Sequence, residues 1–335
     1  MDGQTLDRFR RALSDNKDTL LHWLESEPDR KNVHLGGDDE SKVLQLISDL
    51  KMALENIERG DFGKCTVCGD DVDTNLLEYD FTSSMCLSHY SNEQLQTLQR
   101  ELELVSQVHR DLLPCKTPSL PGIAMAAHTE SARIVGGDYY DFFDFRDHAQ
   151  GIAIADVMDK GLPASMLMSN LQASLRILGP EASELECLAE RLNRLFRRNL
   201  NLIKFISIFF GAIAVRSKTL TYCNAGHHPP LWWQATRKDF QWLSPTGPAL
   251  GLTADPRYAS QSITFAGGDV FVFYTDGLVE AGSNGEQFGE ERLRNYVQNN
   301  LGRPPEDMVK GLLSAARQFA GRFTDDVTLM VVRIL

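Results

Sequence analysis

Apolar residues recur at spacings of three and four along several long stretches of the chain, and this pattern predicts α-helices. The clearest stretches are residues 4–26, 41–59 and 92–113. We expect further helices over 162–178, 182–200 and 305–319. Ser91 and Gln94 fit a capping box that starts the third helix. In that helix a heptad-like stripe, suited to a partner helix, consists of Leu95, Leu98, Leu102, Val105, Val108 and Leu112.

Shorter apolar runs rich in β-branched and aromatic residues predict strands. These runs are Phe205–Val215, Thr219–Asn224, Asp269–Tyr274 and Val327–Ile334. Strands and helices come in groups rather than in strict alternation, so we expect an α+β fold with layered sheets and helices. The longest apolar run is too short to cross a bilayer.

Pro114, Pro118 and Pro121 indicate a joint between domains, which a length of 335 residues allows. We expect a helical module with a cysteine-rich loop over residues 1–90. A linker helix and proline-rich joint would cover 91–121, and a larger domain would cover 122–335.

Composition excludes some classes of function. The formal net charge is −12, which disfavours a surface that coats nucleic acid or anionic lipid, so we expect no membrane and no direct nucleic-acid partner. The first residues are polar and lack the apolar segment of a signal peptide, which predicts a cytoplasmic location. In that compartment the six cysteines would be metal ligands and core thiols rather than disulfides.

Two ligand pairs, Cys65-x-x-Cys68 and Cys86-x-x-His89, predict a tetrahedral zinc site. Four protein ligands leave no open position, so the zinc would be structural. Scattered buried thiols, or a redox role for Cys65 and Cys68, are the alternatives.

Residues 40–90 also resemble the DksA/TraR-type zinc finger. The resemblance lies in Ala53-Leu54-x-x-Ile57-x-x-Gly60-x-Phe62-Gly63-x-Cys65-x-x-Cys68-Gly69, then Leu76-Leu77 and Cys86-x-x-His89. The family usually has four cysteines, so His89 departs from its pattern. Family members bind RNA polymerase, often through a coiled-coil tip. Here the candidate tip, at 29–40, lies on a shorter hairpin, and a polymerase contact through the zinc module is one option.

Four aspartates, each beside an apolar run or a small-residue turn, are the candidate catalytic residues: Asp138, Asp156, Asp276 and Asp325. Magnesium and manganese prefer carboxylate oxygens, and separated carboxylates that meet in the fold suit a two-metal hydrolytic site. Each motif alone has a simpler explanation, such as a turn. Asp326 is either a solvated neighbour of Asp325 or able to exchange roles with it. The Gly-Gly-Asp triplet also resembles the signature of diguanylate cyclases, which leaves Asp276 and Asp325 unexplained.

Residues 122–335 resemble the SpoIIE/RsbU branch of the metal-dependent, type 2C-like protein phosphatases. Five motifs occur in one order: Arg133-x-Val135-Gly136-Gly137-Asp138-Tyr139-Tyr140-Asp141, Ala155-Asp156-Val157-Met158-Asp159-Lys160-Gly161-Leu162-Pro163-Ala164, Asn224-Ala225-Gly226-His227-His228-Pro229-Pro230, Thr275-Asp276-Gly277-Leu278-x-Glu280 and Asp325-Asp326-Val327-Thr328. The resemblance implies two β-sheets flanked by helices, an α/β-β/α sandwich, and hydrolysis of phosphoserine or phosphothreonine.

The same resemblance implies a ligand set for two Mn²⁺ or Mg²⁺ ions, which would activate water for in-line attack on phosphorus. Asp156 would bridge the two metals, with the backbone carbonyl of Val157 completing one coordination sphere. Asp276 and Asp325 would hold the other metal, and Asp138 would contribute directly or through water.

Other polar residues near these motifs have two interpretations each. His227 or His228 would suit a general acid near neutral pH, although their place in a proline-rich turn after a strand favours a structural role. Arg133 would contact either the substrate phosphate or a surface carboxylate. We expect Asp141 and Asp144 at the surface or beside the site.

We therefore expect a regulatory phosphatase that acts in signalling, and the resemblance implies a partner-switching pathway. The resemblance implies a phosphorylated STAS-type anti-sigma-factor antagonist as substrate, and a homodimer through the helix at 92–113. One alternative is a transcription regulator that binds RNA polymerase and uses the phosphatase-like domain only as a scaffold. Another is a phosphatase of small phosphoesters.

Overall fold

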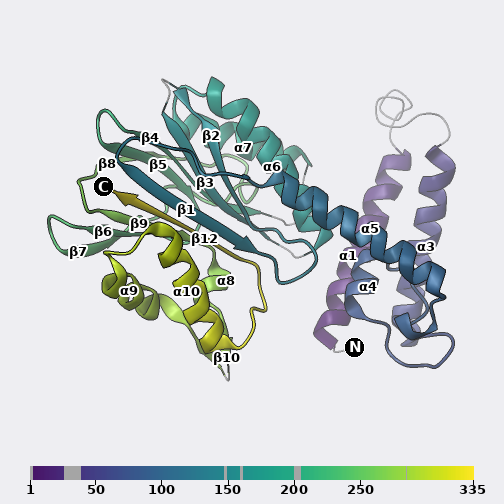
Figure 1. The fold of residues 1–335 in the computed structure, drawn as a ribbon. Helices are drawn as coiled ribbons and strands as arrows, with labels where there is room; N and C mark the ends of the chain where they lie inside the picture. Colours follow the sequence, from purple (N-terminus) through teal and green to yellow (C-terminus); the bar gives the residue numbers. More distant parts are fainter. Residues whose placement is uncertain (1–2, 26–38, 147–148, 159–160, 200–204, 284) are drawn as a thin grey trace. The chain divides into compact units, whose positions relative to one another are not determined.

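The structure is a computed structural model that describes residues 3–25, 39–146, 149–158, 161–199, 205–283 and 285–335 (Figure 1). Its internal contacts divide the chain into two compact units, Met1–Glu101 and Leu102–Leu335. Helix α5 (Asn92–Leu112) crosses this division, because it begins in the first unit and ends in the second.

The first unit is a helical module around one apolar core. Helix α1 (Gly3–Glu25) packs against α3 (Asp39–Arg59), which confirms the two helices expected there. A short helix α4 (Thr74–Tyr79), the 3₁₀-helix η1 (Leu87–His89) and the start of α5 complete it. The core includes Phe9, Leu13, Leu50, Ile57, Phe62 and Leu77. Of the candidate hairpin tip at 29–40, residues 29–38 lie outside the described residues.

The start of α5 confirms the capping box. The Ser91 backbone N–H donates to Gln94 Oε1 at 2.9 Å, and the Gln94 backbone N–H donates to Ser91 Oγ at 3.2 Å. The apolar stripe differs at one position from the expected one. Val108 is exposed, whereas His109 is buried, so the covered stripe runs through Leu102, Val105, His109 and Leu112.

Two five-stranded antiparallel sheets form the second unit, and their central strands are buried on both faces. The first sheet has the order β1 (Ile123–Glu130), β12 (Val327–Ile334), β9 (Val270–Tyr274), β6 (Leu231–Gln234) and β7 (Asp239–Trp242). The second has the order β2 (Tyr139–Asp144), β3 (Gln150–Val157), β4 (Ile206–Ala214), β5 (Thr219–Ala225) and β8 (Gln261–Thr264). A small pair, β10 (Gly282–Ser283) and β11 (Glu286–Gln287), lies apart from them.

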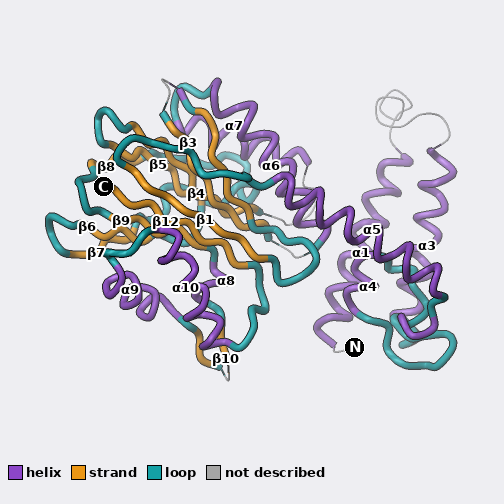
Figure 2. Tube along the Cα trace, viewed as in Figure 1, coloured by secondary structure: helices purple, strands orange, loops and turns teal. Residues whose placement is uncertain are grey.

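Helices cover the outer face of each sheet, as Figures 1 and 2 show. Helices α6 (Leu162–Glu181) and α7 (Leu185–Asn199) pack on the second sheet. Helices α8 (Asp276–Val279), α9 (Gly289–Asn300) and α10 (Pro305–Ala320) lie on the side of the first. The unit is therefore the layered α+β sandwich that the sequence predicts.

The alternation of side chains along each strand builds three apolar layers. On β3, Ile152 and Ile154 face the other sheet, whereas Ala153 and Ala155 face α6 and α7. On β12, Met330 and Val332 likewise fill the layer between the sheets, while Leu329 and Val331 pack beneath the helices. Burial of both faces explains why these strands are almost continuously apolar.

Across the described residues, none of the helices combines the length and apolar character that a bilayer crossing requires.

Candidate functional site

The four candidate aspartates lie at two pairs of strand ends. Asp138 directly precedes β2, and Asp156 lies near the end of its antiparallel neighbour β3, where Tyr139 pairs with Ala155. Asp276 follows β9 and Asp325 comes two residues before β12, and these strands are also antiparallel neighbours. In an antiparallel pair, one strand begins beside the point where the other ends. The two aspartates of each pair therefore lie at the same end of their sheet.

Strand alternation places Asp138 and Asp156 toward the space between the sheets. Asp138 falls on the same face as Tyr140, and Asp156 on the same face as Ile154. Both Tyr140 and Ile154 belong to the apolar layer between the sheets. The two carboxylates therefore lie at the rim of that layer, where the strands of the second sheet end.

Hydrogen bonds join the ends of the two sheets. The Thr275 hydroxyl, which precedes Asp276, donates to Asp138 Oδ2 at 2.7 Å. The Thr328 backbone N–H donates to Thr275 Oγ1 at 2.9 Å. Asp138 lies at the end of the second sheet and Thr275 at the end of the first, so the Thr275–Asp138 bond brings the two aspartate pairs to the same end of the sandwich. The bond from Thr328 holds Thr275 within the first sheet.

Asp326 is buried, which corrects the expectation of a solvated neighbour of Asp325, and its carboxylate anchors a loop. It is 7% exposed, and its carboxylate accepts backbone N–H groups from Ala132 and Gly137, each at 2.8 Å. A Cβ built on Gly136 would lie 2.2 Å from Asp326 Oδ2. The carboxylate thus fixes the loop at 132–138 that leads to Asp138.

Two glycines permit close backbone approach at the site. A Cβ on Gly137 would lie 2.9 Å from the Val157 carbonyl oxygen, which is a predicted metal ligand. A Cβ on Gly277 would lie 1.9 Å from the Asp326 carbonyl oxygen and 3.3 Å from Asp325 Cβ. Neither position has room for a side chain.

Burial raises the pKa of Asp138 well above its usual value, and the carboxylates of Asp156 and Asp326 raise it further. The hydrogen bond from Thr275 opposes this shift. Carboxylates gathered in this way repel one another, and a divalent cation would relieve that repulsion. An all-oxygen set of carboxylates with one carbonyl matches the preference of Mg²⁺ and Mn²⁺, so the residues present fit such ions.

The carboxylates are spread more widely than the zinc ligands. In the part of the chain that the structure describes, a mutually close group of three or more candidate ligands occurs at Cys65, Cys68, Cys86 and His89 but not among the four aspartates. Two cations, rather than one, would suit ligands that are spread in this way.

Asp141, expected at the surface or beside the site, is fully buried and tied to α6. Arg176 of α6 donates to its carboxylate through Nε at 2.9 Å and through the second guanidinium nitrogen at 3.2 Å, and the Tyr139 hydroxyl donates to it as well. Alternation with Tyr139 and Phe143, which face α6 and α7, was the signal that could have located it. Asp144 is exposed.

His227 is buried behind the site rather than open to solvent. Its Nδ1 lies 2.8 Å from Ser207 Oγ, and Ser207 pairs with Asp156 across β3 and β4. Burial, with a smaller contribution from His228, lowers the pKa of His227 to about 3. A buried imidazole that is neutral near pH 7 and bonded to Ser207 supports the structural interpretation of His227 over that of a general acid.

In the first unit, the four predicted zinc ligands converge. One ligand atom from each of Cys65, Cys68, Cys86 and His89 lies within 4.8 Å of the other three. Gly69, at φ 77°, follows Cys68 and donates its N–H to the Cys65 carbonyl at 2.8 Å, which forms the expected tight turn. Hydrogen bonds lower the pKa of the Cys65 thiol, chiefly from the Cys86 backbone, and that of the Cys86 thiol, chiefly from Ser88. The pKa of the third thiol, Cys68, is instead raised to about 12. The ligand set of three cysteines and one histidine is what fits tetrahedral zinc.

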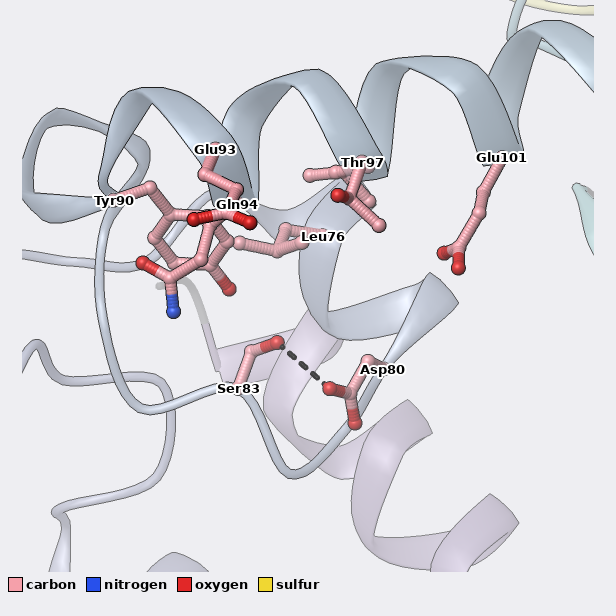
Figure 3. Close-up of a pocket in the computed structure, with 9 residues that line it drawn as sticks. Leu76, Asp80, Ser83, Tyr90, Glu93, Gln94, Thr97 and Glu101 are labelled. Atoms are coloured by element: carbon pink, nitrogen blue, oxygen red, sulfur yellow. Dashed lines mark hydrogen bonds between the residues drawn. The ribbon is translucent and has the colours of Figure 1, made fainter.

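A groove of about 440 Å³ in the same unit lies between α4 and α5 (Figure 3). Three carboxylates line it, from Asp80, Glu93 and Glu101. Asp80 accepts hydrogen bonds from the Ser83 hydroxyl at 3.2 Å and from Thr82, so it stabilises its own turn. The sequence did not single out this groove, and its contacts are those of a turn packed beside a helix.

Comparison with known proteins identifies the second unit. Residues 146–335 match the family described as Stage II sporulation protein E (SpoIIE). The chain belongs to the SpoIIE family. The chain is also similar to phosphoserine phosphatase RsbU of Bacillus subtilis (strain 168), with 27% identity over 239 residues that make up 71% of each protein.

Two solved structures share the fold of this SpoIIE-type phosphatase domain. The RsbU and RsbW domains of Rv1364c from Mycobacterium tuberculosis match with 25% identity and a TM-score of 0.59, over 66% of this chain and 62% of that one. The SiaA-PP2C domain of Pseudomonas aeruginosa matches with 18% identity and a TM-score of 0.62, over 71% of this chain and 98% of that one. The second likeness establishes the PP2C-like fold alone.

Proposed function

We propose that the protein is a metal-dependent phosphoserine and phosphothreonine protein phosphatase that acts in regulatory signalling. Family membership and the likeness to a phosphoserine phosphatase support this reaction. The observation that carries the proposal is the bond from Thr275 to Asp138, because it joins two strand-end pairs of aspartates into one site.

In this proposal the site residues are those that the sequence predicts. Asp138, Asp156, Asp276 and Asp325, with the Val157 carbonyl, would hold two Mn²⁺ or Mg²⁺ ions. When bound, such ions would supply the Lewis acidity that activates water and offsets charge on the phosphoryl group. Thr275 orients Asp138, Asp326 fixes the loop before it, and the glycines at 137 and 277 keep side chains out of the site.

For the substrate, we propose a phosphorylated STAS-type anti-sigma-factor antagonist in a partner-switching pathway. The support is the likeness to RsbU and to the RsbU and RsbW domains of Rv1364c. A protein substrate also distinguishes this function from that of a phosphatase of small phosphoesters.

The first unit would carry one structural zinc on Cys65, Cys68, Cys86 and His89, and the convergence of these four ligands supports that assignment. Helix α5 leads from this module to the phosphatase domain and exposes Leu104 and Val108, which would suit a homodimer contact. A DksA/TraR-like contact with RNA polymerase stays a prediction.

The test is phosphate release by the purified full-length protein with Mn²⁺. A phosphoserine-bearing STAS-type protein, a phosphoserine peptide and a small aryl phosphate would be compared at equal concentrations. We expect the phosphoprotein to have the highest kcat/KM. Higher kcat/KM for the aryl phosphate would favour the small-phosphoester alternative, and no release from any substrate by folded, metal-loaded protein would favour the scaffold.

A further inference from the structure

His109 connects helix α5 to the loop that carries Asp138. It lies in the last turn of α5, and it is 7% exposed. Its Nε2 lies 3.1 Å from the carbonyl oxygen of Gly136. A carbonyl oxygen only accepts hydrogen bonds, so Nε2 carries the proton and His109 is the donor.

This contact completes the support of the loop at 132–138. On one side, Asp326 accepts the N–H groups of Ala132 and Gly137. His109 binds the intervening carbonyl of Gly136. The peptide unit between Gly136 and Gly137, which directly precedes Asp138, is therefore held at its C=O by His109 and at its N–H by Asp326, two side chains from distant parts of the sequence.

The end of α5 is itself fixed to the phosphatase domain. Gln172 of α6 donates through Nε2 to the Leu112 carbonyl at 2.8 Å. Leu112 and Leu113 pack against the apolar cluster beneath α6 and α7. The last turn of α5 is thus a part of this unit, and the His109 ring has a defined place in it.

We propose that His109 is a positioning residue for metal binding: by donating to the Gly136 carbonyl, it holds the loop of Asp138 in the conformation that accepts a divalent cation. This inference rests on the proposed function. Burial, the largest influence, lowers the pKa of His109, which keeps the ring neutral and suited to a single donated hydrogen bond.

His109 lies outside residues 146–335, the part of the chain that matches the SpoIIE family. Its helix, α5, begins in the first unit, so a residue of this helix would support the proposed metal site. The Asp138 loop is therefore hydrogen-bonded directly to the segment that joins the two units. A catalytic domain that began at residue 115 would lack this donor.

The experiment uses three full-length variants. His109→Ala removes the donor, His109→Gln restores an amide N–H that can reach a carbonyl, and Gln107→Ala is a matched control at an exposed position of the same helix. Two quantities are measured: the Mn²⁺ concentration that gives half-maximal phosphate release, and hydrogen exchange of backbone amides in peptides covering 132–138.

We expect His109→Ala to raise the half-saturating Mn²⁺ concentration about tenfold, the effect of one buried hydrogen bond, with turnover at saturating Mn²⁺ changed less than about threefold. Exchange should accelerate in 132–138 and not in the central strands. His109→Gln should recover most of both effects, and Gln107→Ala should match the wild type.

Unchanged Mn²⁺ dependence and exchange in His109→Ala would overturn the inference. So would accelerated exchange throughout the domain, since that outcome means general destabilisation. If the wild type shows no turnover, the proposed function fails. Hydrogen exchange and calorimetric Mn²⁺ binding then test the role of His109 without an activity assay. Faster exchange of 132–138 and weaker Mn²⁺ binding in His109→Ala would support that role, and wild-type values of both would overturn it.

Discussion

Replacing Asp326 by alanine should separate the roles of the two adjacent aspartates. The buried Asp326 accepts two backbone N–H groups at 2.8 Å, whereas the half-buried Asp325 accepts the N–H of Asp326 itself at 2.9 Å. Asp326→Ala therefore removes the anchor of the loop at 132–138, whereas Asp325→Ala removes a predicted metal ligand and the acceptor of its neighbour's N–H.

The size of the effect follows from these contacts. A hydrogen bond to a charged group contributes about 1.5–3 kcal/mol, so two of them contribute about 3–6 kcal/mol. Removing a carboxylate that repels Asp138 offsets part of this loss. We expect Asp326→Ala to lower the free energy of unfolding of the second unit by about 3 kcal/mol, and Asp325→Ala to lower it by less than about 1 kcal/mol.

Urea unfolding followed by tryptophan fluorescence measures this difference, because three of the four tryptophans, Trp232, Trp233 and Trp242, lie in the second unit. Phosphate release with Mn²⁺ would be recorded for the same samples. Asp325→Ala should be stable and inactive, and Asp326→Ala should be both unstable and impaired. Equal stability of the two variants, or a larger loss for Asp325→Ala, would refute the assignment of Asp326 as the loop anchor.

Two further predictions concern His227 and the zinc site. Burial lowers the pKa of His227 to about 3. Below about pH 6.5 the unfolded chain therefore binds a proton that the folded chain does not. As the pH falls from about 6.5 toward 3, the free energy of unfolding should decrease by about 1.4 kcal/mol per pH unit. His227→Gln should lose this part of the pH dependence in urea unfolding at several pH values, and an unaltered slope would contradict the structural role. Cys65→Ser should reduce bound zinc, measured by mass spectrometry of the metal, and should loosen the first unit while sparing the second, because zinc binding supplies folding free energy. Cys115→Ser is the matched control, and full zinc content in Cys65→Ser would disprove the ligand assignment.

Elements with strong local periodicity could be predicted from the sequence. The helix at 92–112 and the strand at 327–334 lie close to their expected bounds. In both, the burial of particular faces leaves a clear pattern of apolar residues in the sequence. Short strands such as β6 and β7, with four residues each, carry too little pattern and depend on pairing with distant segments. The sequence motifs singled out the four aspartates, but not the hydrogen bonds that join the two strand-end pairs.

The supporting residues of the site were harder to predict because their partners are distant in sequence. Asp325 and Asp326 are chemically identical neighbours, and only the loop at 132–138 distinguishes them. Extending the alternation of Met330 and Thr328 would have placed Asp326 on the inner face. The expected apolar stripe included Val108 because valine is apolar, and it therefore missed His109. Spacings of three and four residues from Leu102 lead through Val105 to the buried His109.

The most direct test of the central claim compares the full-length protein with Asp156→Asn and Asp276→Asn in a phosphate-release assay, with a phosphoserine protein as substrate and Mn²⁺ varied. The account predicts Mn²⁺-dependent release by the wild type and a loss of about a thousandfold or more in each variant, which corresponds to about 4 kcal/mol of transition-state stabilisation, with both variants folded. Turnover within about threefold of the wild type in both variants would contradict it.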